Sequence, residues 1–196
     1  MGKAQVTKDL IIARSIPIFN TKGYHATSLS DITKVTGITK GAIYGNFKNK
    51  DDVASSAFDH ASGIVLEQIA QKVREQPTAP LKLKAIVDYF AEYVNNPPIK
   101  GGCPILNTSI ESDDFHPELR AKVIRRITQI KEAIAKMIYR GIKEGQLANM
   151  NNVEEFAGFF YSAISGAIVV SRAEGDDRSF GFTHNYLNHM IDGLTI

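Results

Sequence analysis

Cysteine is scarce in this sequence, since Cys103 is the single one among 196 residues. A lone thiol cannot form a disulfide within the chain, so a reducing compartment is the expected setting. The first ten residues include Lys3, Lys8 and Asp9 and contain no apolar run of signal-peptide length. The lack of a cysteine pair and the lack of a signal peptide together predict a cytoplasmic protein.

Motifs of the common enzymes are absent as well. The sequence contains no G-x-S-x-G, no G-x-x-x-x-G-K and no H-E-x-x-H. Its histidines form no i, i+4 pair and have no cysteine at metal-ligand spacing; they are His25, His60, His116, His184 and His189. We therefore expect no enzyme, no metal site and no cofactor.

Long hydrophobic runs are also missing. The longest uncharged stretch, Phe156–Ser171, has sixteen residues, and it contains serines and glycines. A helix that crosses a bilayer needs about 20 apolar residues. We expect no membrane span here, but a helix that is buried on most of its faces.

No segment alternates strictly between apolar and polar residues, whereas apolar residues recur at every third or fourth position. With 43% hydrophobic and 22% charged residues, the chain has the composition of a soluble globular protein. The expected fold class is all-α. The helices are expected at Val6–Lys22, Leu29–Thr36, Thr39–Phe47, Asp51–Glu75, Leu81–Asn95, Pro104–Glu111, Glu118–Glu144, Val153–Glu174 and Asp177–Leu194.

Positive charge is concentrated near the N-terminus. Residues 1–50 hold eight Lys and Arg against two Asp, a net charge of +6, while the remainder carries −4. This asymmetry favours a small basic module that meets a polyanion, attached to a mildly acidic body. The alternative is a chance scatter of solvated charges.

The basic module contains a helix, a glycine turn and a second helix. Ser28 and Asp31 have the spacing of a capping box, Gly37 suits a left-handed turn, and Thr39 can cap the next helix. Pro17 predicts a kink in the preceding helix. The expected inner face consists of Leu29, Ile32, Val35, Ile38, Ile43 and Phe47.

A helix-turn-helix places the N-terminal residues of its second helix against base edges in the major groove of DNA. Lys40 can donate to guanine acceptors, Thr39 can donate or accept, and Gly41 and Ala42 let the backbone approach. For Thr39, a purely capping role is the alternative.

Three groups of residues suit the phosphate backbone. Tyr44 lies one turn after the base-reading residues, Thr27 and Ser28 stand at a positive helix end, and Lys48 and Lys50 follow. The alternatives are packing for Tyr44 and a solvated surface position for Lys48.

These features together resemble the DNA-binding domain of the TetR family of bacterial transcriptional regulators. The resemblance covers about fifty residues and includes Phe19-x-x-x-Gly23-Tyr24 at the end of the first helix. In that family the positions of Thr27, Tyr44 and Lys50 commonly touch phosphate, and those of Thr39, Lys40 and Gly41 lie near bases. Gly45 departs from the pattern, because many relatives carry a large side chain there.

The resemblance implies two domains, a three-helix DNA-binding domain over residues 1–50 and a helical ligand-binding and dimerisation domain over 51–196. It implies a repressor that binds a palindromic double-stranded DNA operator as a homodimer and leaves it when a small molecule binds. Two alternatives stay open. One is a helical enzyme or carrier with a basic N-terminus, and the other is an activator that needs its ligand to bind DNA.

The inward positions of the central helices are rich in aromatic residues, so we expect a largely apolar effector. For each candidate, a place in the plain core is the alternative. Cys103 has a further alternative, an oxidant sensor. The ligand candidates are Phe58, Tyr89, Phe90, Tyr93, Cys103, Asn107 and Phe159.

The helix expected at Val153–Glu174 carries an apolar stripe on one side and a line of small residues on another, and the last helix adds further apolar residues. Such a line lets a second helix approach closely, which predicts a two-fold four-helix interface between two copies. The interface candidates are Gly158, Ser162, Gly166, Phe180, Leu187, Met190 and Leu194.

Overall fold

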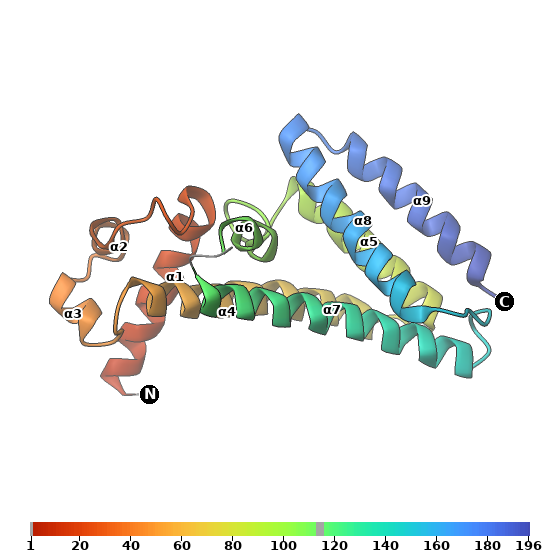
Figure 1. Ribbon diagram of the computed structural model, residues 1–196, viewed down its shortest axis with the longest axis horizontal. Coiled ribbons are helices and arrows are strands. Elements are labelled where there is room, and N and C mark those ends of the chain that lie inside the picture. Colours follow the sequence, from red (N-terminus) through yellow and green to blue (C-terminus); the bar gives the residue numbers. More distant parts are fainter. Residues whose placement is uncertain (1, 113–115) are drawn as a thin grey trace. The chain divides into compact units, whose positions relative to one another are not determined.

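A computed structural model describes residues 2–112 and 116–196, and within these ranges the chain is helical without strands. This confirms the all-α prediction. Figure 1 shows the order of the helices along the chain. They are α1 (Lys3–Lys22), α2 (Leu29–Thr36), α3 (Lys40–Tyr44), α4 (Lys50–Arg74), α5 (Ala79–Asn95), α6 (Pro104–Glu111), α7 (Pro117–Lys143), α8 (Val153–Glu174) and α9 (Arg178–Leu194).

The chain forms two compact units. The first consists of Met1–Val65 with Pro98–Arg125, and the second of Leu66–Pro97 with Arg126–Ile196. The first unit therefore holds α1, α2, α3 and α6, and the second holds α5, α8 and α9. Helices α4 and α7 begin in the first unit and end in the second.

The core of the first unit joins α1, α2, α3 and the start of α4. Burial of a large apolar side chain stabilises a fold by about 1.5–3 kcal/mol, so this small core suffices to hold the short α3 in place. Partly buried Leu29 and Ile38 extend it, as expected from the sequence. Its buried members are Ile11, Ile32, Ile43, Phe47 and Val53.

The α1 helix continues through Pro17 as one element, and the kink expected at this proline stays a prediction. The α3 helix ends at Tyr44 instead of Phe47, because Gly45 forms its C-cap and the chain then turns. Phe47 still reaches the core.

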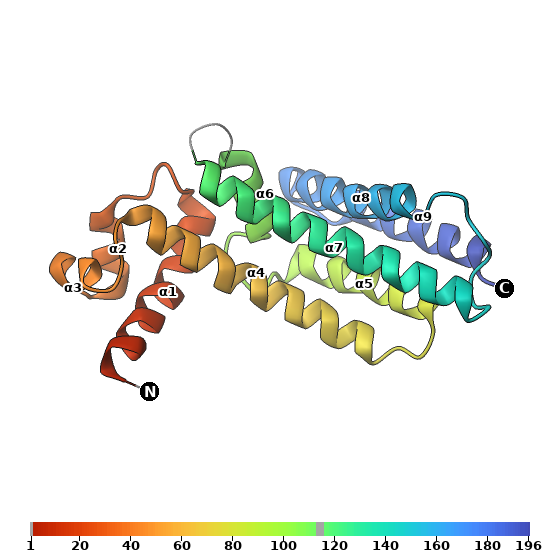
Figure 2. The ribbon, with the colours of Figure 1, turned by 60° about the horizontal axis from the view of Figure 1, so that its bottom comes forward.

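In the second unit, α9 packs against α5 and α8, and Figure 2 shows these helices side by side. Phe160, Ile164 and Ile191 are buried between them. Three polar pairs link α5 to α9 or to the residue that precedes it. They are Lys84–Asp192, Asp88–His184 and Asn95–Asp177.

The expectation that α8 is buried on most of its faces is wrong. Its length and composition would suffice for a membrane span, yet only 33% of its apolar 18-residue window is buried within the chain. One stripe of the helix packs inside the second unit, while Phe159, Val169 and Val170 remain exposed. Packing inside this chain therefore does not explain why the exposed stripe of α8 is apolar.

Candidate nucleic-acid interface

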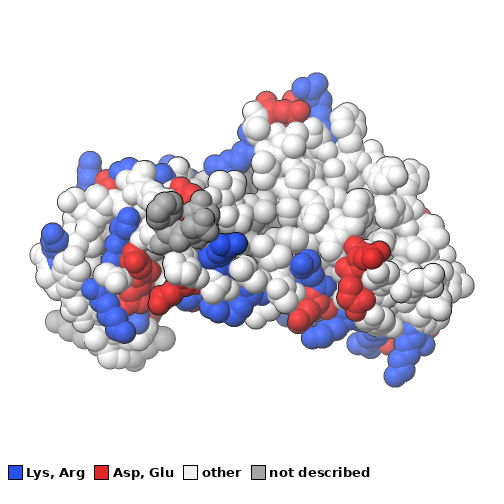
Figure 3. Space-filling view, viewed as in Figure 1, with Lys and Arg blue, Asp and Glu red and all other residues white. Residues whose placement is uncertain are grey.

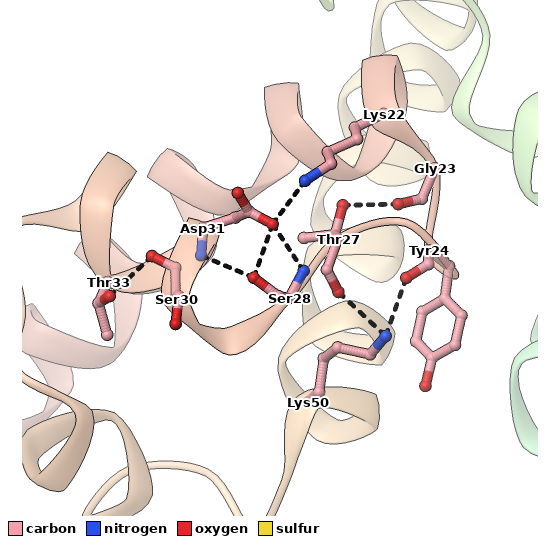
Figure 4. A network of polar contacts seen from close by, with 9 residues as sticks. All are labelled: Lys22, Gly23, Tyr24, Thr27, Ser28, Ser30, Asp31, Thr33 and Lys50. Carbon is pink, nitrogen blue, oxygen red and sulfur yellow. Dashed lines mark hydrogen bonds and ion pairs between the residues drawn. The ribbon is translucent and has the colours of Figure 1, made fainter.

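The start of α2 is fixed by a complete capping box. The Ser28 hydroxyl accepts from the Asp31 amide at 3.1 Å, and the Asp31 carboxylate accepts from the Ser28 amide at 2.8 Å. Lys22 binds the same carboxylate at 2.6 Å (Figure 4). The hydrogen bond from Lys22, followed by those from Ser28, lowers the pKa of Asp31 well below its ordinary value.

The turn between α2 and α3 depends on Gly37, which adopts a left-handed conformation at φ 71° and ψ 10°. Thr36 supports the turn, because its hydroxyl accepts from the Ile38 amide at 3.2 Å. Thr39 then caps α3 by accepting from the Ala42 amide at 3.3 Å. Thr39 is thus the N-cap of α3 and its side chain is also exposed, so its contact with a base stays a prediction.

The outer side of α3 is open. Lys40, Gly41 and Ala42 are exposed, and apart from the neighbouring backbone of α3 no atom in the described part of the chain lies within 4 Å of the place where a Cβ on Gly41 would stand. Tyr44 is 51% exposed, so the alternative that it packs inside the fold is wrong. Ile43 alone of this helix is buried, and it fixes which side faces outward.

Thr27 does not lie on this surface. Its side chain is 1% exposed, and its hydroxyl donates to the Gly23 carbonyl at 2.6 Å. The turn that precedes α2 folds the threonine side chain inward, so its hydroxyl is not available to DNA, while the phosphate contact expected for Thr27 and Ser28 at this helix end stays a prediction. Ser28 is exposed, but its hydroxyl and amide serve the capping box.

The two lysines that follow α3 differ. Lys48 is exposed. Lys50 is partly buried, and its ammonium donates to the carbonyls of Tyr24 and Thr27, both at 3.0 Å (Figure 4). Only the first of them presents its charge to solvent in the manner expected from the sequence.

Tyr24 is a residue whose role the sequence analysis missed. Its hydroxyl donates to Asp51 at the start of α4, and its amide donates to the Glu111 carboxylate of α6 at 2.5 Å. The centroid of its ring lies 4.1 Å from the centroid of the His116 ring. Burial, and then the hydrogen bond to Asp51, raise the pKa of Tyr24 well above its ordinary value. The one sequence feature that points to this role of Tyr24 is its position directly after Gly23, the residue that ends α1.

The ligand candidates fall into separate environments. In α5, Tyr89, Phe90 and Tyr93 form a cluster with ring centroids 5.2–5.8 Å apart. In the first unit Phe58 and Cys103 are buried. Burial of Cys103 agrees with its reading as a small apolar residue.

Two of the ligand candidates have other roles in the structure. Asn107 uses its amide to bind Asn20 and Gly101. Phe159 points outward and lines a groove of about 300 Å³ on the outside of α8 and α9, so its inward placement was wrong.

The interface candidates divide in the same way. Ser162 and Gly166 are exposed on α8, and Gly158, Met190 and Leu194 are partly exposed. Phe180 and Leu187 are each 1% exposed, because they pack inside their own chain, so they are not available as a free apolar surface. The outward apolar residues of α9 are instead Phe182, 73% exposed, and Tyr186, 67% exposed.

The groove over these helices is lined by Phe159, Ala163, Phe182, Thr183, Tyr186 and Leu187. Figure 3 shows few charged side chains over this part of the second unit. Among the described residues, no group of three or more His, Cys, Asp or Glu is arranged to hold a metal ion.

Two family profiles match the chain. "Bacterial regulatory proteins, tetR family" matches residues 11–57, and "Tetracyclin repressor-like, C-terminal domain" matches residues 79–187. The uncharacterized HTH-type transcriptional regulator YezE of Bacillus subtilis is 32% identical over 142 residues, which are 70% of this chain and 71% of that protein.

Solved structures agree with these matches along the whole chain. A TetR-family regulator from Cytophaga hutchinsonii is 34% identical, with a TM-score of 0.92 and coverage of 100% of this chain and 98% of that one. Another from Chloroflexus aurantiacus is 33% identical, with a TM-score of 0.94 and the same coverage. The chain therefore belongs to the tetR family of bacterial regulatory proteins.

Proposed function

We propose that this chain is a transcriptional repressor that binds a palindromic DNA operator as a homodimer and leaves it when a small molecule binds. The observation that carries the proposal is the open N-terminal end of α3, where Lys40, Gly41 and Ala42 are exposed above a buried Ile43. Short side chains beside one donor suit the approach to base edges in the major groove.

Phosphate contacts follow from the same arrangement. The capping box satisfies the Ser28 amide, so the next amides of α2, those of Leu29 and Ser30, stand at the helix start without an intrahelical acceptor. Such amides at a positive helix end attract phosphate oxygens. Tyr44 and Lys48 supply two exposed side chains for further phosphate contacts.

A second copy of the chain is the proposed occupant of the outer face of α8 and α9. This face combines the exposed Phe182 and Tyr186 with Ser162 and Gly166, which allow close approach of another helix. Apolar surface of this kind is seldom left uncovered in a soluble monomer. Two-fold symmetry would then present two α3 helices to two half-sites.

We assign DNA binding to residues 1–50 and ligand binding and dimerisation to residues 51–196, in line with the two matched profiles. The buried aromatic residues of α5 support a small and largely apolar effector. The chain acts by binding, without a catalytic step, as a soluble cytoplasmic protein. One TetR-family regulator of the same fold, CifR, is 18% identical and was solved with a 26-bp operator.

The test starts with DNA from beside the chain's own coding region and with a random-sequence duplex as control. We expect one fragment to be retained preferentially, with an affinity that falls steeply as salt rises, because bound phosphates release counterions. Metabolite mixtures are then screened for release of that fragment. Equal, salt-independent binding of all duplexes would contradict the proposal and favour the carrier alternative.

A further inference from the structure

Glu111 is the last residue of α6, a place that does not suit its charge. The C-terminal end of a helix carries partial negative charge and disfavours an anion. The side chain is also partly buried, and a carboxylate that leaves water loses free energy unless a donor binds it. A carboxylate at this place therefore requires a donor close by.

The turn that follows α1 provides both the donor and the space. The Tyr24 amide donates to the Glu111 Oε2 at 2.5 Å. Gly23, the C-cap of α1, has no side chain, and a Cβ there would collide with Oε1. The carboxylate thus occupies the space that the glycine leaves open, next to the amide that it binds.

The same two residues fix the 23–28 turn, which leads from α1 to α2. The Gly23 carbonyl accepts from the Thr27 hydroxyl at 2.6 Å, and the Tyr24 carbonyl accepts from the Thr27 amide at 3.3 Å. Ser28, the N-cap of α2, follows directly. A shift of Gly23 and Tyr24 therefore shifts the N-terminal end of α2, where phosphate contacts are predicted.

The position of Lys50 depends on this turn as well. Its ammonium donates to the carbonyls of Tyr24 and Thr27 at 3.0 Å each (Figure 4). An ammonium has three donors, so one is left for the phosphate contact predicted from the sequence. The Tyr24 hydroxyl donates to Asp51, the next residue of α4. Tyr24 thus connects α6, through its amide, with the start of α4.

We infer that Glu111 is a positioning residue for DNA binding, which holds the 23–28 turn through the Tyr24 amide so that the start of α2 and the Lys50 ammonium meet phosphate together. The inference rests on the proposed function. A turn that is already ordered loses less conformational freedom when DNA binds, and this raises the affinity. The same bond joins α6, which we assign to the ligand-binding domain, to the DNA-binding domain.

The test compares Glu111→Ala with Asn107→Ala on the operator fragment that the wild type retains. Asn107 is a matched control, because it also lies on α6 and binds the last turn of α1 through Asn20, outside the 23–28 turn. For Glu111→Ala we expect operator affinity to fall about tenfold, as for one lost hydrogen bond to a charged acceptor. Hydrogen exchange of the Tyr24 and Thr27 amides should become faster. Asn107→Ala should keep the operator affinity of the wild type.

Two further variants separate the hydrogen bond from the charge of Glu111. Glu111→Gln keeps an oxygen that can accept from the Tyr24 amide, so it should recover most of the affinity. Glu111→Asp keeps the charge on a side chain that is one methylene shorter, so it should lose affinity as the alanine variant does. These two variants decide the question if Glu111→Ala does not fold.

Unchanged operator affinity in Glu111→Ala or Glu111→Asp would overturn the inference. An equal loss in Asn107→Ala would also overturn it, because any contact of α6 with α1 would then act in the same way. A gain in affinity would mean that the bond holds the turn in a form that DNA does not accept. A wild type that binds no duplex would refute the proposed function together with the inference, whereas a wild type that binds its operator as tightly as the variants do would refute the inference alone.

Discussion

The side-chain amide of Asn107 in α6 donates to two oxygens of Asn20 in α1, the backbone carbonyl at 3.1 Å and the side-chain oxygen at 3.0 Å. Asn20 in turn donates to the carbonyls of Lys100 and Gly102. Gly101, at φ 98°, lies so close to the Asn20 carbonyl that a Cβ there would collide with it. The last turn of α1 is thus bound to the loop before α6 through backbone and amide groups.

Asn107→Ala removes the side-chain amide, so both Asn20 oxygens lose the hydrogen bond that they accept from it. We expect the first unit to lose about 1–3 kcal/mol of stability, since partly buried acceptors lose their partner. Ser109→Ala, an exposed serine of the same helix, should cost less than about 0.5 kcal/mol. Urea unfolding of both variants measures the difference, and equal stabilities would show that the Asn20–Asn107 contact contributes nothing.

Gly23→Ala should be more harmful than Gly37→Ala. Both glycines have positive φ, at 86° and 71°, but a Cβ on Gly23 would also collide with the Glu111 carboxylate, while Gly37 faces open space. We expect losses of about 3 kcal/mol and about 1 kcal/mol, respectively. Thermal unfolding checks the order.

The collision with Glu111 can be separated from backbone strain by a double-mutant cycle. Glu111→Ala removes the obstacle, so Gly23→Ala should cost less in that background than in wild type. Glu111→Ala also removes the acceptor of the Tyr24 amide. The loss of stability in the Glu111→Ala single variant measures the contribution of that hydrogen bond. Strict additivity of the two substitutions would mean that the carboxylate moves away without cost.

Asp31→Asn should make stability depend differently on pH. The folded-state pKa of Asp31 is lowered, chiefly by Lys22, so its charge stabilises the fold above the unfolded pKa of about 3.9. That stabilisation is lost as pH falls below this value toward the folded pKa. The wild type should therefore have the higher Tm at pH 7, and the gap should narrow below about pH 4.

Lys22→Met is the matched control for this effect. Without the lysine the carboxylate keeps its hydrogen bonds from Ser28, so the Tm gap between aspartate and asparagine should be smaller but still present at pH 7. A gap of the same size from pH 7 to pH 3 would show that charge at residue 31 does not stabilise the fold.

Hydrophobic periodicity and capping residues were sufficient to predict nearly all helices, since caps such as Ser28 and Thr39 act through their nearest neighbours. They could not show which apolar side of α9 stays outside. Phe180 and Phe182 are equally apolar, and only the packing of α9 on α5 and α8 places the first inside and the second outside.

In the DNA interface, too, some features could be predicted from the sequence and others depend on the path of the chain. The exposed end of α3 followed from the helix-turn-helix pattern, because that pattern fixes which side Ile43 buries. The inward place of Thr27 and the carbonyl partners of Lys50 depend on the path of a six-residue turn, residues 23–28. Residue type alone carries no information on that path.

Gly166→Leu should produce monomers without unfolding the subunit. Apart from the neighbouring backbone of α8, no atom of the described residues lies within 4 Å of a Cβ at this position, so the added side chain fits the free subunit but obstructs a second helix. Phe182→Glu should act in the same direction by placing a charge on the apolar face. Light scattering measures the mass, and circular dichroism shows that the helices are kept.

Ile110→Glu is the control for exposed apolar surface in general, because Ile110 of α6 is also exposed and lies in the first unit. It should leave the dimer intact. Dimers of unchanged stability in both Gly166→Leu and Phe182→Glu would remove α8 and α9 from the interface.

The most direct measurement of the central claim compares Lys40→Ala with wild type on two duplexes, an operator selected from a random library and an unrelated sequence. If α3 reads bases through Lys40, the variant should lose about 1–3 kcal/mol on the operator and little on the unrelated duplex. Equal losses on both, or no loss on either, would contradict the assignment of α3 as the recognition helix.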